Sequence, residues 1–145
     1  MFTEAIPWIY DDGGRRHAGY RGDTGDCVTR AIAIASGLPY QEIYDLLNDA
    51  AQLERPRKHR RSSARSGVYK PTYNRVLAEM GWEWTPTMGI GTGCQVHLRT
   101  DELPQGRLIV KASKHLVAVI DGFLHDTHDS SRDGTRCVYG YWRQP

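Results

Sequence analysis

The chain has 145 residues, of which 39% are hydrophobic and 25% charged, so it can bury one core and is not uniformly disordered. No apolar run approaches the about 20 residues of a membrane span, and Met1–Tyr10 lacks the pattern of a signal peptide. We therefore expect one cytoplasmic domain over residues 1–145, whose net charge of +2 hides an uneven distribution.

Three helices are predicted in the first half of the chain. Apolar residues recur with helical spacing from Cys27 to a stop at Gly37, from Pro39 to residue 50, and up to Gly81. The residues expected on the three buried faces are Val28, Ala31, Ile32 and Ala35; Ile43, Leu46, Leu47 and Ala50; and Tyr73, Val76, Leu77 and Met80.

A basic stretch separates the second and third predicted helices. Residues 54–70 hold seven Lys or Arg and one Glu, a local net charge of +6, which leaves −4 for the rest of the chain. Arg55–Gly67 shows no apolar periodicity, so we predict a basic flexible insert at about 54–68. Such a run is usually solvated, the interpretation we favour, although it could also bind nucleic acid or an acidic partner.

The second half of the chain predicts an antiparallel sheet. The dipeptide Asp121-Gly122 is a strong signal for a two-residue hairpin turn. Helices first and a meander of strands afterwards indicate an α+β fold. The predicted strands are Arg107–Lys111, His115–Ile120, Phe123–Thr127 and Cys137–Trp142.

The three cysteines, Cys27, Cys94 and Cys137, have no CxxC spacing, which indicates neither a disulfide framework nor a zinc ribbon. In a reducing cytosol all three would be free thiols. Cys27 stands out because it opens an apolar helix, where unpaired backbone N–H groups and the helix dipole favour a thiolate. It is either an activated nucleophile or, like most free cysteines, a small buried apolar residue.

A nucleophilic cysteine needs a base, and His115 is the best placed of the six histidines. It begins the most apolar predicted strand, where an imidazole is well held and still reachable. The alternative is an ordinary surface histidine at a strand end. His17 and His59 lie in polar stretches, and His97 lies in a short segment of ambiguous pattern.

The predicted hairpin selects the third residue. If Asp121-Gly122 is the turn, Asp126 lies opposite Val117, on the same sheet face as His115 and diagonal to it. A carboxylate there can reach an imidazole nitrogen. A register slip of one residue would reverse this assignment.

The neighbours of Asp126 divide by strand parity. His128 would lie opposite His115, whereas His125 and Asp129 should face away. A metal site made of His125, His128 and Asp129 would need ligands from both faces, so we expect no metal and no cofactor.

Two segments resemble the papain-like cysteine peptidase superfamily: GDCVTRAIAIA at 25–35 and KHLVAVIDGFLHD at 114–126. They are most similar to compact bacterial and phage-encoded members, including transglutaminase-like forms. In that superfamily a Cys begins the central helix, a His begins a core strand, and an Asp or Asn lies on the next strand. The resemblance implies a papain-like fold, with N-terminal helices packed on a C-terminal antiparallel sheet, and a triad of Cys27, His115 and Asp126.

The resemblance implies a hydrolase or acyltransferase that acts on an amide, peptide or isopeptide bond of a protein or peptide substrate. Members of the superfamily usually place a Gln before the Cys to bind the oxyanion, whereas Arg21, Asp23 and Thr24 occupy that neighbourhood here. The Cys27 N–H could serve as one oxyanion donor, and the second is unassigned. The alternatives are a catalytically inactive papain-like protein that binds through the 54–70 insert, and a plain structural component.

Overall fold

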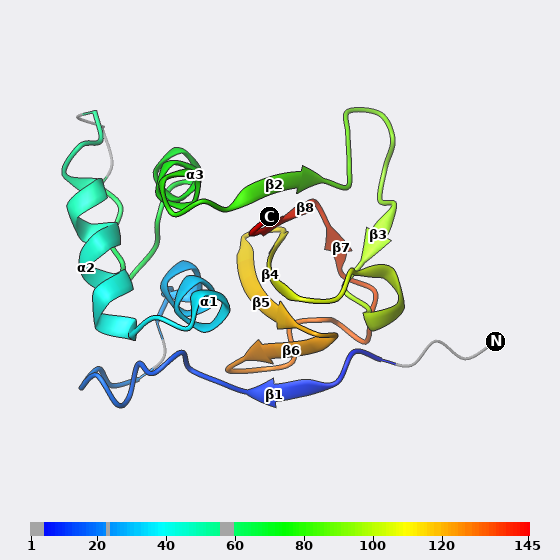
Figure 1. Ribbon diagram of the computed structural model, residues 1–145, viewed down its shortest axis with the longest axis horizontal. Helices are drawn as coiled ribbons and strands as arrows, with labels where there is room; N and C mark the ends of the chain where they lie inside the picture. The colour runs from blue at the N-terminus through cyan, green and yellow to red at the C-terminus, as the bar shows by residue number, and fades with distance from the viewer. Residues whose placement is uncertain (1–4, 23, 56–59) are drawn as a thin grey trace.

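The fold is α+β, as the sequence predicts. In the computed structural model the described residues are 5–22, 24–55 and 60–145, and they form three helices and a six-stranded sheet (Figure 1). The sheet has the order β1-β6-β5-β4-β8-β2, and β3 and β7 pair separately. The helices are α1 (Cys27–Ser36), α2 (Tyr40–Ala51) and α3 (Lys70–Glu79), with a 3-10 turn at Thr100–Glu102. The strands are β1 (Trp8–Tyr10), β2 (Glu83–Pro86), β3 (Val96–His97), β4 (Arg107–Ala112), β5 (His115–Ile120), β6 (Phe123–Asp126), β7 (Cys137–Val138) and β8 (Gly140–Arg143).

The hairpin between β5 and β6 has the predicted register. Ile120 pairs with Phe123, and the turn residues Asp121 and Gly122 have φ of 48° and 81°, as a two-residue turn between twisted strands requires. A second two-residue turn joins β4 to β5, with Lys114 at φ 54° immediately before His115. The two turns fix both ends of β5 and the start of β6.

The sheet is not wholly antiparallel, which corrects one expectation. The N-terminal strand β1 pairs in parallel with β6, so that Tyr10 lies beside Asp126. The predicted strand 137–142 is divided into β7 and β8, because Tyr139 donates its N–H to the carbonyl of Lys111 instead of continuing one strand. The sheet therefore contains strands from both ends of the chain.

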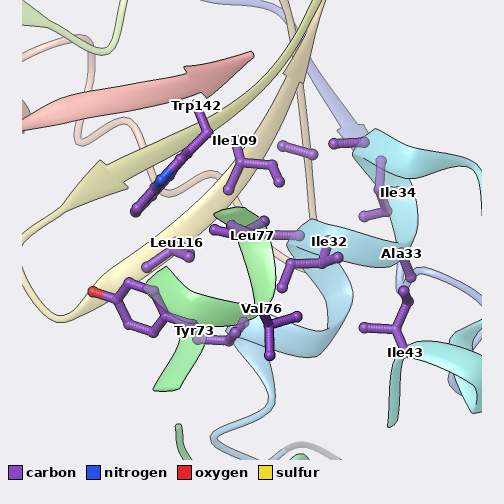
Figure 2. Close-up of a cluster of buried hydrophobic side chains, with 14 of the residues drawn as sticks. Ile32, Ala33, Ile34, Ile43, Tyr73, Val76, Leu77, Ile109, Leu116 and Trp142 are labelled. Carbon is purple, nitrogen blue, oxygen red and sulfur yellow. The ribbon is translucent and has the colours of Figure 1, made fainter. Parts of the chain in front are cut away.

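The helices cover one face of the sheet and create the larger core (Figure 2). Helix α1 packs against β4 and β5, and α2 packs against α1 and α3. Alternate residues of β4 and β5 face away from the helices and form a second core with Leu98, Leu124 and Val138. Leu46, expected in the core, is 38% exposed because α2 turns Ile43 and Leu47 inward instead.

Part of the basic insert is packed against the helices. Its residues 56–59 lie outside the described part of the chain. Beyond them, Ala64 is buried, accepting a hydrogen bond from Thr29 Oγ1 at 2.7 Å and donating its N–H to Asn48 Oδ1 at 2.9 Å. Glu54 accepts hydrogen bonds from the backbone N–H and hydroxyl of Ser62. Ser62 and Ala64 thus attach the C-terminal part of the insert to α1, to α2 and to the residues that follow α2.

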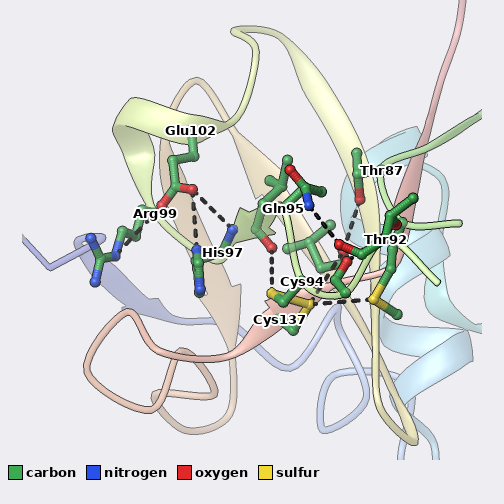
Figure 3. Close-up of a disulfide and its surroundings, with 12 residues drawn as sticks. Thr87, Thr92, Cys94, Gln95, His97, Arg99, Glu102 and Cys137 are labelled. Carbon is green, nitrogen blue, oxygen red and sulfur yellow. Dashed lines mark hydrogen bonds and ion pairs between the residues drawn. A yellow bond between two sulfur atoms is a disulfide. The ribbon is translucent and has the colours of Figure 1, made fainter.

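The expectation of three free thiols is wrong. Cys94 and Cys137 form a disulfide, with Cα atoms 5.8 Å apart (Figure 3). The pairing of β3 with β7 places His97 beside Cys137 and so brings the segment around Cys94 to the second cysteine. The two cysteines are 43 residues apart, and nothing local in the sequence indicates that these strands pair. Cys27 is the free cysteine.

No helix in the described ranges has both the length and the apolar character needed to cross a membrane.

Candidate active site

Cys27 lies at the first residue of α1 and is half-buried. No acidic side chain lies in the first turn, so the unpaired backbone N–H groups present a positive end to the thiol. Burial alone would raise the pKa of Cys27. A hydrogen bond and the charge of His115, the backbone N–H of Leu116 and the charge of Arg30 outweigh burial, so the pKa of the thiol is lowered.

His115 joins the thiol to a carboxylate. Its Nε2 lies 2.6 Å from Asp126 Oδ2, which leaves Nδ1 as the nitrogen available to Cys27. Burial would lower the pKa of His115, but hydrogen bonds and charge interactions with Asp126 and Cys27 raise it to about 9. The diagonal pair predicted from strand parity is therefore present.

Asp126 is almost fully buried, and every described hydrogen-bond partner of its carboxylate is a donor. Oδ2 accepts hydrogen bonds from His115 and from Ser130 Oγ at 2.8 Å, and Oδ1 accepts from the Thr127 N–H at 2.7 Å and from Arg30 Nη2 at 3.2 Å. Burial would raise the pKa of Asp126, but its bond and charge interaction with His115 and its other donors lower it to about 2. Asp126 is thus held as an anion beside the imidazole.

A buried ionic network behind the triad was not predicted from the sequence. Arg30 bridges Asp126 to Asp26, and Asp26 also accepts hydrogen bonds from Arg15 at 3.0 Å and from the Tyr40 hydroxyl at 2.7 Å. All four members of this group around Asp26 are buried. The available signal was a single Arg in the otherwise apolar first helix, four residues after Asp26, which is the spacing of an ion pair.

Of the other residues near Asp126, His125 has its predicted strand parity, whereas His128 and Asp129 lie beyond the end of β6. His125 turns away to Asp11, with Nδ1 3.1 Å from Oδ2, and Asp129 accepts hydrogen bonds from Ser131. His128 stays on the side of His115, with ring centroids 5.6 Å apart.

The ligand atoms of His115, Asp126 and His128 lie within 4.8 Å of one another, so this group has the composition of a metal site. The 2.6 Å contact between His115 and Asp126 is shorter than the separation of about 3.4 Å between two ligands of one tetrahedral zinc ion. The two side chains fit a shared proton better than a metal ion.

A cleft of about 440 Å³ opens beside the nucleophile, lined by Cys27, His115 and part of the basic insert, residues 66–70. Gly25 permits this arrangement, because a Cβ there would lie 2.5 Å from the carbonyl oxygen of Ser66. No Asn or Gln occurs among the described residues that line the cleft, so the second oxyanion donor stays unassigned.

Two of the insert's cations are used within the chain. Arg61 donates hydrogen bonds to the carbonyls of Ala51, Gln52 and Glu54, and Arg65 donates to the carbonyl of Arg21 and lies over the Tyr20 ring. Arg57 and Lys58 lie outside the described residues. Arg61 and Arg65 therefore support the packing of the insert.

Comparison of the chain with protein-family models, curated proteins and solved structures finds no match.

Proposed function

We propose that the chain is a papain-like cysteine hydrolase or acyltransferase acting on an amide, peptide or isopeptide bond. One observation carries the proposal: a free thiol of lowered pKa lies at a helix N-terminus beside His115, and His115 is bonded to a buried carboxylate. Nucleophile, base and orienting group then have the order that covalent catalysis requires. The fold class and the order of the elements agree with this family.

The two pKa shifts favour an ion pair of a Cys27 thiolate and a His115 imidazolium. The pKa of Cys27 is lowered from 9.0, while that of His115 is raised to about 9. At any pH above the lowered pKa of Cys27 and below the raised pKa of His115, Cys27 is the anion and His115 carries the proton that the leaving group needs. Asp126 stabilises the imidazolium and keeps Nδ1 directed to the thiol.

The reaction proceeds in two acyl transfers. The Cys27 thiolate attacks the carbonyl carbon, and the C–N bond breaks as His115 gives its proton to the leaving amine. This leaves a thioester on Cys27. His115 then takes a proton from water, whose oxygen attacks the thioester; the carboxylic acid leaves, and Cys27 and His115 return to the thiolate and the imidazolium. An amine that attacks in place of water gives transfer instead of hydrolysis.

The proposal is tested by acylation with p-nitrophenyl acetate, which needs no knowledge of the natural substrate. We expect rapid release of p-nitrophenolate and an acetyl group on Cys27, detected by mass spectrometry of the intact chain. Cys27→Ala should abolish the burst, and His115→Ala should slow it at least about 10-fold. A wild-type chain that acylates no faster than its urea-unfolded form would instead favour the inactive binding protein.

A further inference from the structure

The cleft beside Cys27 is lined by cations. Lys70, Lys111 and Lys114 contribute to its walls, and the described residues around it include no Asp or Glu. A neighbouring cavity of about 380 Å³ shares Lys70 and Lys111 and is otherwise lined largely by tryptophan, again with no acidic residue among those described. The two cavities therefore meet at a pair of lysines next to the nucleophile.

Of the three lysines that line the cleft, Lys111 is the one that the fold holds in place. It extends from β4 and is half-buried, with Nζ 5.7 Å from the centroid of the Tyr73 ring and 6.0 Å from that of Tyr139. Within the described part of the chain it makes no ion pair with a carboxylate, although burying an ammonium group without one is costly. Lys70 and Lys114, in contrast, are exposed.

Two helix ends add to the positive potential of the cleft. Helix α1 begins at Cys27 and α3 at Lys70, both of which line the cleft, and neither helix has an acidic residue in its first turn. In a partly enclosed site such fields act with little screening. A substrate group that enters there gains most if it is an anion.

We propose, on the basis of the function inferred above, that the cleft selects acyl donors with a carboxylate close to the scissile bond, and that Lys111 pairs with this carboxylate. Such a group would reach Lys111 at the junction of the two cavities, where its bond to the ammonium is charge-assisted. The carboxylate belongs either to an acidic side chain or to the end of a peptide. Lys111 is then a specificity-determining residue.

The test uses three short peptides of equal length that carry the same acrylamide group as a trap for Cys27. The first has Glu beside the acrylamide and an amidated C-terminus, the second has Gln and the same amide, and the third has Gln and a free C-terminal carboxylate. We expect one of the two acidic peptides to alkylate Cys27 about 10-fold faster than the neutral peptide. The faster of the two identifies the source of the carboxylate.

Substitutions test whether Lys111 causes the faster reaction of the acidic peptide. Lys111→Gln should reduce it to less than about 2-fold, and Lys111→Arg should keep a measurable part of it because the charge is retained. The matched control Lys114→Gln removes an exposed lysine of the same cleft and should leave most of the preference. Alkylation of Cys27 by uncharged iodoacetamide should stay within about 3-fold in all variants, which shows that the fold and the nucleophile are intact.

Two results would overturn the proposal. Equal rates for acidic and neutral peptides in the wild type would exclude an anion-selective cleft. Equal slowing of all three peptides by Lys111→Gln would show that Lys111 acts on the reaction itself and not on the substrate's charge. A Cys27 that fails to react with iodoacetamide as well as with the peptides would instead refute the proposed function on which this inference rests.

Discussion

Replacing Asp126 with Asn tests how the triad is held together. Each carboxylate oxygen accepts from two donors: His115 and Ser130 at Oδ2, and the Thr127 N–H and Arg30 at Oδ1. An amide has one oxygen and one NH₂ group. In either orientation, two of these four donors would face the NH₂ group, which cannot accept a hydrogen bond. The backbone N–H and the guanidinium cannot become acceptors, whereas the hydroxyl and a neutral imidazole can.

The Asn side chain should therefore place its NH₂ group toward His115. His115 would be fixed as the neutral tautomer with the proton on Nδ1, facing Cys27, where it can neither accept the thiol proton nor stabilise a thiolate. The rise of the His115 pKa from 6.5 to about 9 corresponds to about 3 kcal/mol, most of which this substitution would remove. We expect a loss of about 2–3 kcal/mol in the free energy of unfolding and at least about 10-fold slower alkylation of Cys27 at pH 7.

The measurements are urea unfolding and the rate of iodoacetamide modification at Cys27. The matched control is Asp129→Asn, in the same acidic run, because Asp129 Oδ1 accepts both bonds from Ser131 and an amide oxygen can replace it. The control should stay within about 0.5 kcal/mol of the wild type. Full stability and full reactivity of Asp126→Asn, or a larger effect in the control, would refute this account of the hydrogen bonds.

Three further predictions follow from the site and its supports. In Cys27→Ala, Asp126 alone still raises the pKa of His115, so the free energy of unfolding should fall as pH rises above 6.5. It should fall again below pH 3.8, because the lowered pKa of Asp126 contributes stability only while this carboxylate is ionised, and a flat urea-unfolding profile would contradict both shifts. Gly25→Ala should cost about 1–3 kcal/mol and speed tryptic cleavage near residue 65, because the added Cβ meets the carbonyl of Ser66, whereas Gly89→Ala has room and should be silent in both assays. The unreduced, urea-unfolded chain should titrate as one thiol with a thiol reagent, and three thiols without reductant would contradict the disulfide.

The sequence predicts the parts of the fold that depend on local signals. The helix from Cys27 to a left-handed Gly37 at φ 74° and the hairpin at Asp121 are both confirmed, since cap residues and two-residue turns have strict backbone requirements. Strands β1 and β2 were missed because each is a short edge strand without alternation, and because β1 pairs with a strand more than 110 residues away.

In the candidate site, too, the features that depend on local pattern could be predicted and those that depend on tertiary packing could not. His115 and Asp126 could be paired from the sequence because strand parity relates residues on both sides of a known turn. The role of Arg30 could not be predicted, because a charged residue in a helix usually marks the solvent side, and only tertiary packing shows that it is buried between two carboxylates. The docking of residues 60–67 depends on the same kind of long-range hydrogen bonds.

The pKa of Cys27 tests the central claim most directly. It is measured as the pH dependence of iodoacetamide modification at Cys27, read by mass spectrometry, in the wild type and in His115→Ala. We predict a reactive thiolate whose ionisation midpoint lies below the ordinary thiol value of 9.0. A second change should occur at about 9 as His115 loses its proton, and the midpoint should return toward the ordinary value in the variant. A wild-type midpoint at or above 9.0, unaffected by the loss of His115, would contradict the proposed nucleophile.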